Sequence, residues 1–235
     1  MAEARFEGFR RYAVYAAPGG DLGRFGADWL GWDAETGCLR NGPPAGVAPL
    51  PRPWSEVVAA PARYGFHGTL KPPFRLAPGT DAAQLHWAIQ ALCLRLVPVD
   101  AGPLRLARIG GFVALVPAGP AIALQALAAR LVEALDAFRA PPTPDETARR
   151  IPDRLTARQR ALLDRWGYPF VMEEFRFHLT LTGDLPEAEA EAAIGALAPA
   201  VEAVLPPALR LPDVALFGEA PDGRFRLIHR YPLGG

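Results

Sequence analysis

The sequence has little cysteine, hardly any lysine and no long apolar run. Its two cysteines, Cys38 and Cys93, have neither the spacing of a metal site nor that of a redox pair, so we expect reduced thiols. Because no run of about 18 apolar residues occurs, a transmembrane helix is not expected. The first residues, MAEARFEGFRR, do not resemble a signal peptide. These absences predict a cytoplasmic protein that does not associate with a membrane.

The sequence also lacks an excess of either charge. Its 235 residues include 25 basic and 25 acidic ones, so the formal net charge is zero. This balance argues against a nucleic-acid footprint along the whole chain, although it leaves room for a local basic site. Half of the residues are apolar and 21% are charged, the ordinary composition of a globular protein with a sizeable core.

Lysine occurs once, at Lys71, whereas 24 of the 25 basic residues are arginine. Together with the abundance of alanine, proline and glycine, this indicates a codon bias that replaces dispensable lysines. A lysine that persists under such a bias fits a position that needs a compact point charge rather than a planar guanidinium. Chance explains a single lysine equally well, so whether Lys71 has a function depends on the residues around it in the sequence.

The stretch RYGFHGTLKPPF, residues 63–74, predicts a strand with a polar face. Because side chains alternate along a strand, Arg63, His67, Thr69 and Lys71 share one face. An imidazole, a hydroxyl and an ammonium then lie within reach of one small anion. Taken alone, the pattern is better explained by a half-buried strand whose polar face meets water.

A second stretch, FRFHLTLT (175–182), repeats this pattern. Alternation places Arg176, His178, Thr180 and Thr182 on one face, and the continuous apolar face opposite must be packed. Both copies read aromatic-x-Phe-His-x-Thr-Leu. The repeat favours a shared role for the two polar faces.

The segments that follow the two copies also correspond. Each copy is followed by a helical pattern and then by two strand-like runs around a turn signal. The recurrence of the whole order indicates an internal duplication and predicts two related lobes. The helices are expected over 81–96 and 186–204, and the strand pairs over 104–109 with 112–117 and over 208–217 with 224–231.

We interpret residues 1–235 as a single bilobed domain. The first repeat covers about 62–118, a helical connection covers about 119–170, and the second repeat covers about 171–232. Gly/Pro-rich composition predicts loops between the remaining elements. These elements are a strand over 10–18, helices over 23–33, 122–138 and 156–166, a loop over 41–53, a surface linker over 141–153 and an arginine-rich arm over 149–165.

Two lobes that each contribute a His-x-Thr strand suit chemistry at phosphorus. Imidazole titrates near neutral pH, so one histidine can take a proton from the attacking hydroxyl or water while the other protonates the departing oxygen. The threonine hydroxyls would hold the non-bridging oxygens, and the basic side chains would clamp the phosphate. Carboxylates are absent from both polar faces, so we expect no metal. Outside the repeat, Tyr12 and Tyr15 could reach the cleft from the first strand, but core packing explains them better, and His86 and His229 are interpreted as structural.

FHGTL (66–70) and FHLTL (177–181) resemble the paired His-x-Thr motifs of the 2H phosphoesterase superfamily. RYGFHGTLKPPF and RWGYPFVMEEFRFHLTLTG (165–183) resemble a bacterial branch associated with phosphonate-metabolism genes. The resemblance implies an α+β fold with two pseudo-symmetric lobes, each an antiparallel sheet flanked by helices, around a central cleft. It also implies metal- and cofactor-independent cyclic-phosphodiester chemistry. The catalytic set that it implies is His67, Thr69, His178 and Thr180.

We therefore predict a phosphodiesterase that opens a small cyclic phosphodiester, with 5-phosphoribosyl 1,2-cyclic phosphate suggested by the phosphonate association. Two alternatives stay open: an enzyme acting on RNA 2′,3′-cyclic phosphate ends, which predicts a basic groove with aromatic side chains, and a non-catalytic binder of nucleotides or sugar phosphates. We expect a monomer with a small phosphorylated substrate, RNA being the less favoured partner. Substrate contacts are expected from Arg63, Tyr64, Lys71, Arg176 and Thr182.

Overall fold

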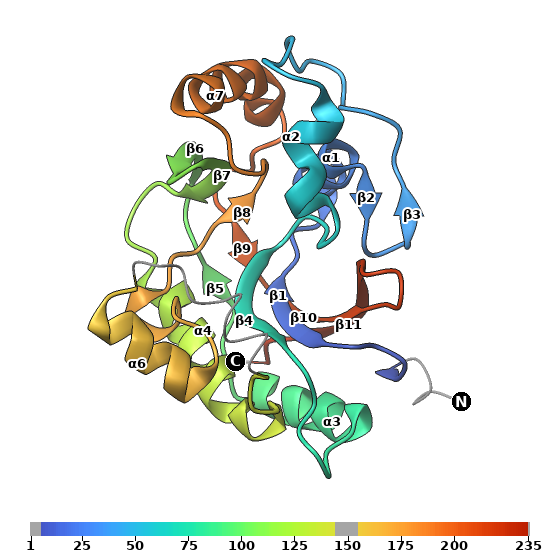
Figure 1. Cartoon of the computed structure of the whole chain (residues 1–235), viewed down its shortest axis with the longest axis vertical. Helices are drawn as coiled ribbons and strands as arrows, with labels where there is room; N and C mark the ends of the chain where they lie inside the picture. The colour runs from blue at the N-terminus through green and yellow to red at the C-terminus, as the bar shows by residue number, and fades with distance from the viewer. Residues whose placement is uncertain (1–5, 144–154, 235) are drawn as a thin grey trace.

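A seven-stranded antiparallel sheet runs through the protein in the computed structural model, which describes residues 6–143 and 155–234 (Figure 1). Helices flank the sheet, so the α+β class expected from the sequence is confirmed. The strands in spatial order are β11 (Phe225–Pro232), β10 (Asp213–Glu219), β1 (Tyr12–Ala16), β4 (Gly68–Phe74), β8 (Leu179–Thr180), β7 (Phe112–Pro117) and β6 (Leu104–Ile109).

The helices follow the apolar periodicity of the sequence and begin at the expected caps. Asp81 and Thr156 each form a capping box with the third residue of the helix that follows. Gly167 ends the later of these two helices in the left-handed conformation. The helices are α1 (Gly20–Leu30), α2 (Trp54–Ala62), α3 (Ala82–Cys93), α4 (Ile122–Ala134), α6 (Ala157–Trp166) and α7 (Glu187–Glu202), with 3-10 turns η2 (Asp136–Phe138) and η3 (Met172–Glu174).

Some boundaries differ from the sequence-based expectation. The helix expected over 23–33 is α1, which ends at Leu30 because Gly31 adopts a left-handed conformation there. The two residues that follow form β2 (Trp32–Asp33), which pairs with β3 (Cys38–Leu39). Helix α2 was not predicted. Most of the expected linker over 141–153, and with it much of the arginine-rich arm, lies outside the described residues.

The sheet is centred on the contact between β4 and β8, which carry the two His-x-Thr motifs. These strands pair at Gly68 and Leu179. The hairpin β6–β7 follows the first motif in sequence, yet it pairs with the strand of the second motif. The hairpin β10–β11 follows the second motif and reaches β4 through β1. The two halves therefore exchange hairpins, and the sheets that we expected to be separate join at one residue pair.

Strand β1 is buried on both of its faces. Tyr12, Val14 and Ala16 belong to the main core, which the sheet forms with α1, α3, α4 and α7. Ala13 and Tyr15 point to the opposite face, where a smaller aromatic cluster contains Trp32, Phe217 and Phe225. This second face is the one on which the motif histidines lie. Across the described ranges, every helix is too short or too polar to traverse a lipid bilayer.

Candidate active site

The two His-x-Thr motifs cross at a single point of the sheet. Because β4 and β8 run antiparallel with Gly68 opposite Leu179, the register places His67 opposite Thr180, and Thr69 opposite His178. Leu179 points into the core and is fully buried, so its neighbours in the strand point to the other face. The four motif side chains therefore gather on one face of the sheet.

Glycine at position 68 allows this close approach of the strands. A Cβ atom on Gly68 would lie 2.6 Å from Cζ of Phe177 and 3.2 Å from Cδ2 of Leu179. Both contacts are shorter than van der Waals packing permits without a shift. The middle residue of the first motif therefore has to be small, because the side chains of Phe177 and Leu179 pack over it.

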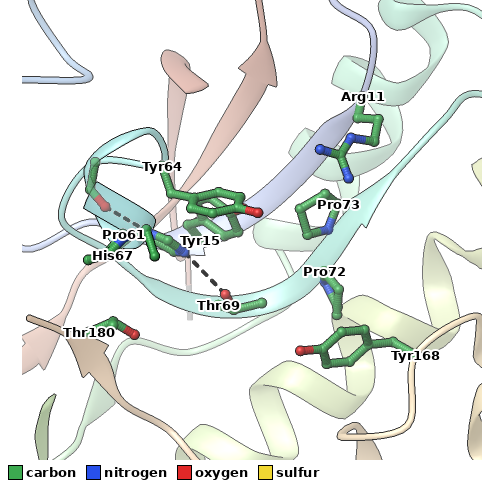
Figure 2. Close-up of a pocket in the computed structure, with 12 residues that line it drawn as sticks. Arg11, Tyr15, Pro61, Tyr64, His67, Thr69, Pro72, Pro73, Tyr168 and Thr180 are labelled. Atoms are coloured by element: carbon green, nitrogen blue, oxygen red, sulfur yellow. Dashed lines mark hydrogen bonds between the residues drawn. The ribbon is translucent and has the colours of Figure 1, made fainter. Parts of the chain in front are cut away.

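The backbone holds both imidazoles in the same way. Nδ1 of His67 lies 2.9 Å from the carbonyl oxygen of Gly65, and Nδ1 of His178 lies 2.8 Å from that of Arg176. A carbonyl oxygen only accepts, so each Nδ1 must carry the proton that is donated. Each neutral imidazole then has its lone pair on Nε2, and the hydroxyl of Thr69 lies 3.2 Å from Nε2 of His67 (Figure 2).

The ring of Tyr15 packs against the imidazole of His67. The two rings stack with their centroids 3.7 Å apart and an interplanar angle of 22°, and Tyr15 is 1% exposed. Burial lowers the pKa of His67 to about 4, the bond to Gly65 opposes this effect, and the charge of His178 lowers the pKa further. Burial also lowers the pKa of His178. The strand register places the two imidazoles on a diagonal of the β4–β8 pair, where charges on one affect the other.

Two adjoining cavities open on this face, one at each histidine. The cavity at His67 has a volume of about 360 Å³ and is also lined by Thr180. The cavity at His178 has a volume of about 390 Å³ and is also lined by Thr69. Thr69, Pro72 and Tyr168 line both. Each cavity thus contains the histidine of one motif and the threonine of the other, as the strand register requires.

Two prolines keep the sheet open beside the cavities. In the pairing of β1 with β4, Tyr12 lies opposite Phe74 and Val14 opposite Lys71, so the single residue between them faces both Pro72 and Pro73. Proline has no N–H group to donate to a neighbouring strand and is typical of bulges and strand edges. Tyr168 enters the opening from the segment after α6 (Figure 2).

The linings of the two cavities differ in character. Arg11, Tyr64 and Tyr168 supply polar groups to the His67 cavity, with Tyr64 beside His67 and Arg11 and Tyr168 farther from it (Figure 2). The His178 cavity is mostly aromatic and apolar, and Gln159, Glu174 and Arg176 supply its polar groups. Its aromatic residues are Phe112, Tyr168, Phe170 and Phe175.

Lys71 lies on the other side of the sheet, contrary to the expectation from strand alternation. In the pairing with β1, Thr69 faces Tyr15 but Lys71 faces Val14, so one step on β1 corresponds to two on β4. This β-bulge turns Lys71 toward the core, where it is 2% exposed and donates to the carbonyl oxygen of Val132 at 3.2 Å. The interpretation of Lys71 as a phosphate ligand is therefore corrected.

Thr182 also points away from the cavities. Its hydroxyl accepts from the amide of Val113 at 2.9 Å and donates to the carbonyl oxygen of Gly183 at 2.8 Å. The amides of Leu181 and Thr182 both donate to the Val113 carbonyl, so the chain is irregular directly after the second motif. Thr182 is fully engaged in holding this turn. We correct its assignment as a substrate contact.

Arg63 and Tyr64 lie in a turn after α2 and not in a strand, because β4 begins only at Gly68. The guanidinium of Arg63 stacks on the ring of Tyr64 and donates to its hydroxyl oxygen. Of these two residues, only Tyr64 lines the His67 cavity. Arg176 lines the His178 cavity, as expected.

Three residues of the site had no assigned role in the sequence interpretation. Tyr15 was interpreted as a core residue, and it does pack in the second cluster while stacking on His67. Arg11 and Tyr168 line the His67 cavity but lie outside the repeated motifs. Tyr168 belongs to the stretch RWGYPF, in which no local pattern indicates a position in the site.

A family model described as "Protein of unknown function (DUF1045)" matches residues 69–226, which is more than half of the chain. The chain belongs to this family. The matched range contains the second motif and begins at Thr69, two residues after His67.

Two curated relatives are both named "Ribose 1,5-bisphosphate phosphokinase PhnN". The one from Janthinobacterium sp. (strain Marseille) is 38% identical over 189 residues, which are 79% of this chain and 41% of the relative. The one from Laribacter hongkongensis (strain HLHK9) is 40% identical over 185 residues, 76% of this chain and 41% of the relative. The chain thus spans about two fifths of the length of these relatives.

Among solved structures, the chain is similar to E. coli LigT complexed with NADP+ and with 3′-AMP. The first has a TM-score of 0.45 and 15% identity, and covers 97% of this chain and 100% of that chain. The second has a TM-score of 0.46 and 16% identity, and covers 97% and 99%. A similarity this low transfers neither residues nor activity. The two His-x-Thr strands pair with each other at Gly68 and Leu179, so the motifs that resemble those of the 2H phosphoesterase superfamily lie side by side in this chain.

Proposed function

We propose that this protein is a metal-independent phosphodiesterase that hydrolyses a small cyclic phosphodiester. The observation that supports this most directly is the crossing of the motif strands at Gly68 and Leu179. It gathers two imidazoles, both with Nδ1 engaged by the backbone and the lone pair on Nε2, together with two hydroxyls, of which that of Thr69 lies 3.2 Å from Nε2 of His67. A pair of titrating groups of this kind fits acid–base catalysis better than binding alone.

In the proposed reaction, the cyclic phosphate lies over the crossing. His67 is the better candidate for the base, because burial keeps its imidazole neutral. Its Nε2 accepts a proton from water while the water oxygen forms a bond to phosphorus. The ester bond to one ring oxygen breaks, and that oxygen takes a proton from Nε2 of His178. Thr69 and Thr180 donate hydrogen bonds to the non-bridging oxygens, where charge develops.

The proposed acid must be protonated when the substrate binds. Burial lowers the pKa of His178 in the free protein. A bound phosphodiester anion favours the charged imidazole and acts in the opposite direction. The substrate therefore helps to charge the group that its own cleavage requires. The products are a phosphate monoester and a free hydroxyl, so atoms and protons balance without a further reactant.

For the substrate, we propose 5-phosphoribosyl 1,2-cyclic phosphate. The names of the curated relatives refer to ribose 1,5-bisphosphate, which is the compound formed when the bond between phosphorus and the 2-oxygen of this cyclic phosphate breaks. The nucleotide-binding motif G-x-x-x-x-G-K-[ST] requires a lysine after glycine, whereas Lys71 follows Leu70. Phosphokinase activity is therefore not proposed for this chain.

A second candidate is an enzyme acting on RNA ends that carry a 2′,3′-cyclic phosphate. The aromatic lining of the His178 cavity supports it, because aromatic side chains stack with bases. A further groove of about 600 Å³ shares Ile109, Phe175 and Arg176 with this cavity and adds Arg105 and Arg108. Arg108 is occupied by Glu187 and Glu191, which weakens the basic character of the groove.

The deciding experiment is turnover of the purified protein, with chelator present, on the phosphoribosyl cyclic phosphate and on 2′,3′-cyclic nucleotides. Phosphorus NMR distinguishes ribose 1,5-bisphosphate from the 2,5-isomer. We expect the 1,5-isomer. Faster turnover of the cyclic nucleotides would favour the RNA enzyme, and binding without turnover of either substrate would contradict the proposed activity.

A further inference from the structure

Arg11 lies in the wall of the His67 cavity, away from the histidine itself (Figure 2). It precedes β1 and is four residues before Tyr15, the residue that stacks on His67. Four residues of strand span about 13 Å, so the backbones of Arg11 and Tyr15 are well separated. The guanidinium and the imidazole therefore border one cavity from different parts of its wall.

An ion pair fixes the orientation of this guanidinium. Nε of Arg11 lies 2.5 Å from Oε2 of Glu219, and Nη2 lies 3.0 Å from Oε1. The backbone is fixed as well, because the amide of Glu219 donates to the carbonyl oxygen of Arg11 at 2.8 Å. Two of the five guanidinium N–H groups are used by this pair, and among the described residues the other three have no hydrogen-bond acceptor. Arg11 is thus held as a pre-oriented donor.

Tyr64 adds a second donor beside Arg11. Its ring stacks on Phe225 with the centroids 5.0 Å apart, and Arg63 donates to its hydroxyl oxygen. Because that oxygen already accepts a hydrogen bond, its own proton points elsewhere. Figure 2 shows the hydroxyl of Tyr64 and the guanidinium of Arg11 on the same side of the cavity.

The charge of the lining matches an anion. Among the described residues that line the His67 cavity, Arg11 alone has a permanent charge, and none is Asp or Glu. Glu219 forms the ion pair with Arg11 but does not line the cavity. The hydrogen bond to Glu219 raises the pKa of Arg11, so the guanidinium stays charged at every relevant pH.

We propose that Arg11, with the hydroxyl of Tyr64, binds a second phosphate group of the substrate while the first reacts at the histidines. This inference rests on the proposed function and narrows its substrate class. The substrate is a sugar that carries a cyclic phosphate and, about one sugar length away, a terminal phosphomonoester. A bidentate arginine contact suits the two oxygens of such a terminal group.

Calorimetric binding of ribose 1,5-bisphosphate and ribose 1-phosphate tests this without any turnover. The parent protein is expected to bind the bisphosphate about 10- to 100-fold more tightly, the usual worth of hydrogen bonds to a charged group. The Arg11→Ala variant should lose most of this preference, while its affinity for ribose 1-phosphate changes by less than about threefold. Arg52→Ala is the matched control, because Arg52 forms a similarly half-buried ion pair with Glu189 but lines neither motif cavity.

Removal of Arg11 leaves the buried carboxylate of Glu219 without its partner, which endangers folding. The double variant Arg11→Met with Glu219→Gln removes both charges and keeps the side-chain volume. Loss of the preference in this folded variant supports the proposal. Equal weakening of both ligands, or no preference in the parent protein, overturns it.

The same measurements separate this inference from the proposed function. An Arg11-dependent preference for the bisphosphate, without any turnover of cyclic phosphates, leaves the second phosphate site standing and contradicts the phosphodiesterase. If parent and variant both hydrolyse cyclic phosphates equally well with and without a terminal phosphate, the phosphodiesterase stands and the second phosphate site is contradicted.

Discussion

The imidazole of His67 lies across the strand pair from Thr180, not from His178, because β4 and β8 run antiparallel with Gly68 opposite Leu179. Each cavity is therefore built by the histidine of one half and the threonine of the other. A phosphate placed over the crossing meets both imidazoles along a diagonal, which is the geometry that an acid and a base on opposite sides of one phosphorus require.

The histidines give the first prediction. His67→Ala and His178→Ala should each lower turnover about 100- to 10,000-fold, the typical worth of a general acid or base, with a much smaller effect on substrate affinity. His229→Ala is the control, because His229 lies on β11 and lines neither motif cavity. Steady-state kinetics and ligand titration on the three variants measure both quantities. Turnover at the parent level in either motif variant would mean that the repeated histidines are structural.

A second prediction concerns Gly68. In Gly68→Ala, the new Cβ atom has to displace the ring of Phe177, so we expect a loss of about 1–3 kcal/mol in the free energy of unfolding. Turnover should fall as well, because Phe177 directly precedes His178 and its displacement moves that imidazole. Gly195→Ala is the matched control: position 195 is exposed on α7, nothing lies near its Cβ, and alanine should stabilise the helix by about 0.5–1 kcal/mol. Urea unfolding distinguishes them, and a stability unchanged in Gly68→Ala would contradict the tight approach.

The pKa of His67 predicts how stability depends on pH. The value is about 4 in the folded protein and near 6.5 in the unfolded chain. Between these pH values the unfolded chain binds a proton that the folded protein does not, so the free energy of unfolding decreases as the pH falls. His67→Gln lacks this effect and should show a shallower decrease over the same range. Parallel curves for the two proteins would mean that His67 is not shielded from solvent as described.

Lys71 gives the fourth prediction. Burial lowers its pKa to about 8, and the ammonium bonds to Val132 on the side of the sheet away from the cavities. Lys71→Met keeps the volume and removes a buried charge, so stability should be unchanged or higher. Affinity for ribose 1,5-bisphosphate should stay within about threefold of the parent value. A large loss of affinity in this variant, with folding intact, would mean that Lys71 does contact the substrate phosphate.

The sequence was a good guide where the strands are regular. Strand alternation correctly grouped His67 with Thr69 and His178 with Thr180, because the register is undisturbed across these few residues. It failed directly after each motif, because the pairing is irregular at Leu70 and Leu181. As a result Lys71 points into the core, and Thr182 holds a turn instead of facing the cavities. A bulge depends on the partner strand, which the local pattern does not contain.

The remainder of the site depends on topology. Arg11 precedes a strand whose neighbours β4 and β10 come from distant parts of the chain, so no local pattern indicates that it borders a cavity. Tyr168 reaches the same cavity from the segment between α6 and η3. Both residues become recognisable only when the order of the strands is known.

The exchange of hairpins has a consequence for the origin of the chain. Neither repeat can complete its own part of the sheet, since the strand that borders β8 follows the first motif and the hairpin beyond β1 follows the second. An ancestor with one repeat would have needed a second copy of itself, with two identical histidines related by an exact dyad. Fusion of two such copies would release the histidines from that identity. In the proposed reaction, one imidazole would then be free to specialise as proton acceptor and the other as proton donor.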